Sequence, residues 1–264
     1  MRPILTAPIR AFYSSELYRE AAGWKPWLAL LYLAYLLALC WVPAVFAMYR
    51  ACAKFMAAEA PEIIRQTPSV TIDHGRVSTD VAQPYVIRSR GDKPVIMIID
   101  TSGQTTSLDG QDAQLLLTRD KLIAKRNTAE TRIYDLSSVK HFHVDRDGVR
   151  KWLRIIAAWG PVLVYPLAVL GAWIYRLVQA LLYSLVALLL AQAMQVRLPY
   201  GALLGLTVVA MTPAILAKTL LTITKTNFPF SGWVLVGLTI GFILFGLNAV
   251  KAMSTAEAPP AQPA

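Results

Sequence analysis

Long apolar runs lie near both ends of this chain, and a polar stretch of about a hundred residues separates them. One run covers 27–47, and the others lie between Ile155 and Val250. A helix of roughly 20 apolar residues is long enough to cross a bilayer. The pattern therefore predicts an α-helical membrane protein with about four spans, five being the alternative. A small β-rich (α+β) domain is inserted after the first span.

The composition and the charge distribution both favour a membrane protein. Hydrophobic residues make up 56% of the chain and charged residues only 16%, which is more apolar than a typical soluble domain. The net charge of +10 is spread along the sequence, without the Lys/Arg block that follows a phosphate backbone. We therefore exclude nucleic acid as a partner and expect membrane lipid as the acidic surface.

These runs divide the chain into five predicted segments. They are a cytoplasmic amphipathic interfacial segment (1–26), a first transmembrane helix (27–49), an extracytoplasmic β-rich domain (50–150), a C-terminal transmembrane bundle (151–251) and a disordered tail (252–264). Four basic residues precede the first span, so the positive-inside rule places the N-terminus in the cytoplasm. The expected location is the bacterial cytoplasmic (inner) membrane, with residues 50–150 outside the cytoplasm.

The segment before the first span has helical periodicity. Apolar residues recur at helical spacing over 9–22, including Leu17 and Tyr18, with charged residues between them. This pattern predicts one amphipathic helix in the headgroup region. Trp24 and Trp27 flank Lys25 just after it, as in interfacial anchors.

The polar stretch has the pattern of short β-strands. After a helical extension that ends before Pro68, β-branched and apolar residues form short runs bounded by turn residues. The clearest pair is 70–72 with 77–79, which flank the turn Asp73–Gly75. The pattern predicts about seven or eight short strands ending near Val144.

The apolar region 155–196 admits two interpretations. As one helix it would be roughly 60 Å long, about twice the hydrocarbon thickness. Because Gly160 and Pro161 offer a break, we expect an interfacial helix up to Trp159 and then one long tilted span. The alternative has two spans with Arg176 in a tight loop. Further on, the sequence predicts a turn at 197–201 and two more spans, 202–221 with a bend at Pro213 and 231–250.

Arg176, Gln179 and Tyr183 are the candidate binding residues. Their spacing of i, i+3 and i+7 places them on one helical face. An arginine at membrane depth costs at least about 2.5–3.5 kcal/mol and normally faces a bundle interior, a cavity or a partner. In the five-span alternative Arg176 is merely interfacial.

Other motifs favour structural roles. Asp100 lies in Ile98–Gly103, which is similar to the catalytic loop of aspartic proteases, but Ser102 interrupts the tripeptide and no second copy exists. His141 and His143 share a strand face, where a solvated pair is commoner than a metal site. The sequence contains no phosphate loop and no nucleophile–base arrangement. We therefore expect no enzyme activity, no metal and no cofactor.

Several stretches together resemble one known family. They are Phe12–Arg19, Ile72–Ser78, Gln83–Ile87, Ile98–Thr101, Leu116–Ile123 and Arg132–Leu136. Their order and spacing are similar to a bacterial membrane-protein family of unknown function (domain-of-unknown-function family eleven-eighty-nine). Some of its members are encoded in maltodextrin-utilisation gene clusters. The C-terminal spans, with Ala210–Pro213, are distantly similar to Yip-type membrane proteins. The resemblance implies one N-terminal span, an extracytoplasmic domain and a C-terminal bundle, and it implies no catalytic residues.

Two hypotheses for function follow. The first is a non-enzymatic accessory or scaffold protein whose extracytoplasmic domain docks a partner, another membrane or periplasmic protein. The alternative is a transporter or lipid-handling protein that uses the face of Arg176, Gln179 and Tyr183. A homo-oligomer is compatible with either. The weaker third interpretation, a ligand sensor, lacks a cytoplasmic output domain in this sequence.

Overall fold

The computed structural model describes residues 2–88, 95–108, 110–125, 130–226 and 229–256. The chain divides into two compact units. Unit 1 combines Met1–Phe46 with Leu163–Ala264, and unit 2 is Ala47–Val162. Two long helices, α3 (Pro26–Ala58) and α5 (Arg146–Ala193), each contribute one end to each unit.

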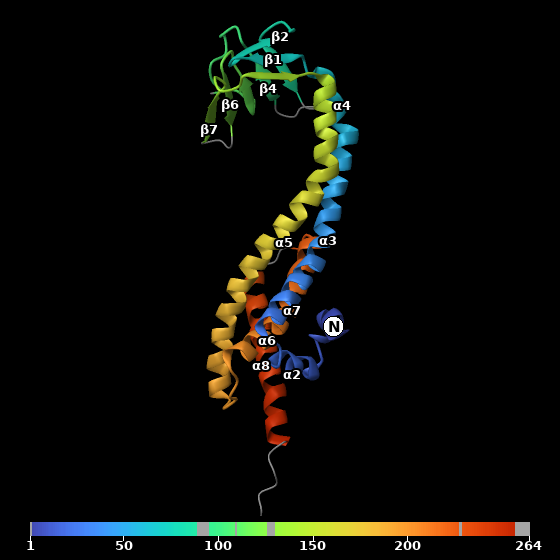
Figure 1. Ribbon diagram of the computed structural model, residues 1–264, viewed down its shortest axis with the longest axis vertical. Helices are drawn as coiled ribbons and strands as arrows, with labels where there is room; N and C mark the ends of the chain where they lie inside the picture. The colour runs from blue at the N-terminus through green and yellow to red at the C-terminus, as the bar shows by residue number, and fades with distance from the viewer. Residues whose placement is uncertain (1, 89–94, 109, 126–129, 227–228, 257–264) are drawn as a thin grey trace, which may run out of the picture. The chain divides into compact units, whose positions relative to one another are not determined.

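Unit 1 is helical and packs around α6. Besides parts of α3 and α5 it contains α1 (Arg2–Arg10), α2 (Ser15–Ala22), α6 (Tyr200–Ala210), α7 (Thr212–Ile223) and α8 (Ser231–Ala256). Every residue of α6 from Ala202 onward is buried. Helix α2 packs on both α6 and α8 (Figure 1). Two glycines permit this approach, because a Cβ on Gly205 would meet the Ala21 carbonyl and a Cβ on Gly246 would meet the Tyr18 ring.

The N-terminal segment differs from the single helix predicted over 9–22. Helix α1 ends at Arg10, and α2 starts after Ser14, whose Oγ accepts a hydrogen bond from the Leu17 amide at 3.3 Å. This N-cap explains the break, because a serine side chain satisfies an otherwise unpaired amide of the new helix. Leu17 and Tyr18, predicted to face the headgroup region, are fully buried within unit 1.

The break predicted near Gly160 and Pro161 is also wrong, because α5 is one continuous helix of 48 residues that also runs through Arg176. Proline is tolerated inside long apolar helices when neighbouring groups satisfy the carbonyls it frees. Here the Tyr49 hydroxyl of α3 donates to the Ala158 carbonyl at 3.2 Å, next to the carbonyl that Pro161 leaves free. In unit 1, α3 and α5 are joined by hydrogen bonds from Tyr165 to the Ala38 carbonyl and from Trp173 to the Leu30 carbonyl.

Four helical stretches of the described chain are long and apolar enough to cross a membrane: Pro26–Ala58, Arg146–Ala193, Tyr200–Ile223 and Ser231–Ala252. The third is interrupted at Met211, immediately before Thr212 and Pro213, where the sequence predicts a bend. Helix α8 continues to Ala256, into the segment predicted to be a disordered tail; the rest of that segment, 257–264, lies outside the described residues.

Unit 2 carries two small sheets after the short helix α4 (Ala60–Gln66). The strands are β1 (Val70–Asp73), β2 (Arg76–Thr79), β3 (Tyr85–Arg88), β4 (Val95–Ile99), β5 (Leu115–Leu117), β6 (Lys121–Lys125), β7 (Thr131–Asp135) and β8 (His141–Val144). The strand orders are β2-β1-β8 and β3-β4-β5-β6-β7, and only the β4–β5 pairing is parallel (Figure 1). The predicted hairpin around Asp73–Gly75 is confirmed, with Val70 opposite Thr79.

Apolar side chains cover both faces of the five-stranded sheet. One cluster joins Ile72 and Val77 of the smaller sheet to Ile87, Ile99 and Leu117 of the larger one. The other face carries Ile98, Leu116 and Ile123, which pack against Leu108 and Ala113 from the β4–β5 connection. The connection therefore serves as the second cover of the sheet.

Candidate functional site

Arg176 and Gln179 form the centre of the predicted polar face on α5. The Arg176 guanidinium donates from Nη1 to Oε1 of Gln179 at 2.7 Å. The Gln179 amide in turn donates to the Tyr175 hydroxyl at 3.4 Å, and the guanidinium carbon lies 5.8 Å from the centre of the Tyr175 ring. Both Arg176 and Gln179 are half-buried. The cation of this face, Arg176, is therefore held by two neutral partners, the Gln179 amide and the Tyr175 ring.

No carboxylate of the described chain neutralises Arg176. The sequence contains no Asp or Glu between Asp147 and Glu257. In the described part of unit 1 the acidic residues are Glu16 and Glu20, and both lie within 3.5 Å of Arg10. A half-buried guanidinium without an acidic partner favours an anion supplied from outside the chain, either a phosphate group or a carboxylate on another protein.

The third predicted residue, Tyr183, is not hydrogen-bonded to this group in the described structure; it is half-buried and packs against the core of unit 1. Sequence reasoning missed Tyr175, although its i, i+4 spacing to Gln179 was visible. Thr212, next to the predicted bend at Pro213, is buried, and its Oγ1 lies 2.9 Å from the Tyr32 hydroxyl of α3. The bend at Thr212 and Pro213 therefore has a packing role.

A second candidate surface is the β7 edge, which we define as strand Thr131–Asp135. This strand ends the five-stranded sheet, and all five of its residues are exposed. Ile133 is 64% exposed and Tyr134 48% exposed. They point to opposite faces, since successive side chains alternate in a strand. Among the described residues, neither apolar cluster of the domain includes a side chain of β7, although one of them contains Leu136 directly after it.

The two remaining motifs have structural roles. The Asp100 carboxylate is buried and accepts hydrogen bonds from Ser102 and from the Thr105 amide, which closes the turn after β4. His143 bonds to Thr71, and Asp73 lies 3.1 Å from His74 and 3.7 Å from His141. Within the described residues no group of three or more His, Cys, Asp or Glu side chains could hold a metal ion.

The sequence comparisons identify a family and nothing more specific. No curated protein and no solved structure matches the chain. One family model, described as "Protein of unknown function (DUF1189)", matches residues 8–247. Because this match covers most of the sequence, and agrees with the resemblance carried by its motifs, the chain belongs to the DUF1189 family.

Proposed function

We propose that this protein is a non-enzymatic accessory or scaffold protein of the bacterial cytoplasmic membrane, and that its β-rich domain docks a partner protein through the β7 edge. The observation that carries this proposal is that all five residues of β7 are exposed, among them the apolar Ile133 and Tyr134. Soluble proteins normally protect such an edge with short strands, charges or a covering element.

The edge suits an extended segment of another protein. Within the described residues, β6 pairs with one side of β7 and no strand pairs with its other side, so backbone N–H and C=O groups there are open to a partner. A partner strand would satisfy these groups, and its side chains would pack on Ile133 and Tyr134. Because α3 precedes the domain and α5 follows it, the domain is tied to apolar helices at both ends. Such a tether favours a partner at the membrane surface.

The membrane orientation is part of the same proposal. Before α3 the chain carries four basic residues, Arg2, Arg10, Arg19 and Lys25, against Glu16 and Glu20. This excess places the N-terminus in the cytoplasm by the positive-inside rule. Four spans then place both termini inside and residues 50–150 outside. Cysteine-accessibility labelling at Ser78 and at Ser14 tests it in a chain whose free Cys40 and Cys52 are replaced by serine, since an impermeant reagent should then reach only a cysteine at position 78.

In-cell photo-cross-linking tests the docking surface. A photoreactive residue at Ile133 should cross-link to one protein in stoichiometric yield, and the same residue at Ser78 should not. Ser78 is the matched control because it is exposed on β2, the edge of the other sheet. Ile133→Lys should abolish recovery of that protein, since a lysine on an edge strand opposes strand addition. Recovery of the chain with only bound lipid would overturn the docking proposal, and a second copy as the captured protein would identify a homo-oligomer.

A transporter or lipid-handling role is the second candidate, and the unneutralised Arg176 favours it. If the polar face handles an anionic substrate, Arg176→Leu should abolish movement of a fluorescent phospholipid between leaflets of proteoliposomes while the protein remains folded. Lys218→Leu is the control, as another cation of unit 1 that lies exposed on α7. The scaffold role instead predicts that Arg176→Leu is tolerated and that Ile133→Lys is not.

A further inference from the structure

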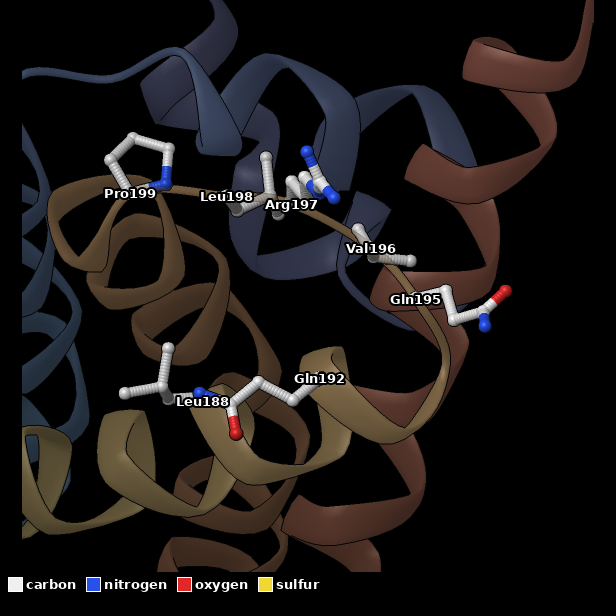
Figure 2. Close-up of a pocket in the computed structure, with 7 residues that line it drawn as sticks. All are labelled: Leu188, Gln192, Gln195, Val196, Arg197, Leu198 and Pro199. Carbon is white, nitrogen blue, oxygen red and sulfur yellow. The ribbon is translucent and has the colours of Figure 1, made fainter.

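A cavity of about 870 Å³ lies at the end of α5, apart from the face of Arg176. Its walls are formed by Leu188, Gln192, Gln195, Val196, Arg197, Leu198 and Pro199. Figure 2 shows that Leu188 and Gln192 come from the last turns of α5, and that the loop carrying Val196–Pro199 passes opposite them on its way to α6. A volume of this size is typical of sites for small organic ligands.

The loop that forms one wall has a fixed start. The Val196 amide donates to the Ala191 carbonyl at 2.8 Å, and the Gln195 amide donates to the Gln192 carbonyl at 3.0 Å. Gln195 has a φ of 62°. Together these features form a Schellman motif, which ends α5 in a defined geometry. Val196 also packs against the core that contains Ala191. The wall opposite α5 is therefore preformed.

The lining combines one cation, polar amides and apolar side chains. In the described structure, the side chains of Gln192 and Arg197 form no hydrogen bond or ion pair within the chain. Figure 2 shows the Gln195 side chain turned away from Leu188. As noted above, no acidic residue occurs between Asp147 and Glu257. The lining thus contains the unneutralised guanidinium of Arg197 together with the apolar side chains of Leu188, Val196 and Leu198.

We propose that this cavity binds the headgroup of an anionic phospholipid. Arg197 would bind the phosphodiester, because guanidinium groups match phosphate oxygens in geometry and charge. Gln192 would donate to a glycerol or ester oxygen, and Leu188, Val196 and Leu198 would contact the first methylenes of the acyl chains. In the proposed orientation the loop between α5 and α6 faces the cytoplasmic leaflet, which is the leaflet with a negative surface potential.

The apolar lining and the position decide between a lipid and a free phosphate. A free phosphate would gain nothing from the three aliphatic side chains, whereas a phospholipid uses them together with the cation. The cavity also follows directly on α5, a helix long and apolar enough to cross a membrane. The site rests on the proposed membrane placement and is independent of docking at the β7 edge.

Native mass spectrometry of the full-length protein in mild detergent tests the site. Titration with phosphatidylglycerol should give a saturable bound lipid, and phosphatidylethanolamine should bind more weakly. Arg197→Ala should weaken phosphatidylglycerol binding about tenfold, the effect expected from one hydrogen-bonded charge. Arg197→Lys should recover part of the affinity. Lys25→Ala is the matched control, as an exposed cation before α3, and should bind the lipid as the wild type does.

Three results would overturn the proposal. They are equal binding of the two lipids, equal losses in Arg197→Ala and Lys25→Ala, and displacement of phosphatidylglycerol by inorganic phosphate. Alkaline extraction of the source membranes tests independently whether the chain is an integral membrane protein. A chain released by alkali would refute the placement, whereas a retained chain without selective lipid binding would refute only the Arg197 site.

Discussion

Gly205 is the position where the smallest substitution should disturb unit 1 most. A Cβ at this residue of α6 would lie 2.2 Å from the carbonyl oxygen of Ala21 in α2, whereas close C–H···O contacts measure about 3.3 Å. Gly205→Ala therefore forces the two backbones apart by about 1 Å. Side-chain rotation cannot relieve the contact, because the opposing atom belongs to the backbone.

Two opposing effects set the change in the free energy of unfolding that Gly205→Ala causes. Overpacking of a buried site costs about 1–3 kcal/mol, and replacing glycine by alanine inside a helix returns up to about 1 kcal/mol. The opposing atom cannot move alone, so we expect a net loss of about 1–2 kcal/mol in the free energy of unfolding. By the scaling known for soluble domains, this loss lowers the apparent Tm by roughly 2–8 °C. Thermal unfolding in detergent, followed by size-exclusion chromatography, measures the shift.

The chain contains its own control for this experiment. Gly237 and Gly241 lie in α8, and a Cβ on either would meet no other atom within 4 Å. Gly237→Ala should leave the apparent Tm unchanged or raise it slightly, since only helix propensity changes. If Gly205→Ala proved as stable as Gly237→Ala, the close packing of α2 on α6 would be refuted.

Two further predictions concern buried polar groups. Tyr32→Phe should lower the free energy of unfolding by about 1 kcal/mol, because it removes the buried hydroxyl contact with Thr212. A double-mutant cycle with Thr212→Val should show that the two effects are coupled. Strictly additive effects would contradict the hydrogen bond. Burial raises the pKa of Asp100, but hydrogen bonds from Ser102 and Thr105 outweigh it and hold that pKa below its ordinary value. A carboxyl with a lowered pKa in the folded state stabilises the fold above its unfolded pKa of about 3.9 and loses this effect as the pH falls through the folded value. The protection factors of the β4 amides in the full-length protein, which correct for the slower intrinsic exchange in acid, should therefore fall at acid pH. Asp100→Asn should have lower protection factors than the wild type at neutral pH and a flatter pH dependence. Parallel acid profiles of the two proteins would rule out Asp100.

The local elements of this fold were predictable where short-range rules decide them. The hairpin at Asp73–Gly75 has a turn signal between two short strands, and both strands form as predicted. The helix break near Pro213 also follows from local chemistry, because proline has no amide to donate. The same rule failed at Pro161, where α5 continues without a break and is held to α3 by the hydrogen bond from Tyr49 to the Ala158 carbonyl. That contact depends on a helix about a hundred residues away, so the local sequence does not show it.

The prediction for the N-terminal segment was wrong for a different reason. An apolar stripe indicates that a helix face is buried, but it does not indicate what covers it. Leu17 and Tyr18 have the spacing of a membrane-surface helix, yet α6 and α8 cover them. The cap at Ser14 was visible in the sequence, since serine before a helical run is a common start signal.

Of the candidate surfaces, the sequence also predicted only the one that depends on local contacts. Arg176 and Gln179 were predictable because i, i+3 contacts lie within one helix. The exposure of β7 was not, because it requires the strand order. In the strand order β3-β4-β5-β6-β7, β6 carries the last buried residue, Ile123, and β7 lies beyond it at the edge. The cavity at Arg197 was also missed, since the sequence shows a turn there but not the space between that turn and α5.

The distribution of charge separates the proposed roles of the two units. Thirteen of the 16 acidic residues lie between Glu59 and Asp147, in unit 2, whereas the stretch 163–256 of unit 1 carries five basic residues and no acidic one. An anionic ligand should therefore bind unit 1, and docking at the β7 edge should not depend on it. Arg197→Ala should alter lipid retention without changing the cross-link at Ile133, and Ile133→Lys should do the reverse. If each variant lost both lipid retention and the cross-link at Ile133, binding of the lipid and binding of the partner would be coupled. The proposal of two independent binding surfaces would then be refuted.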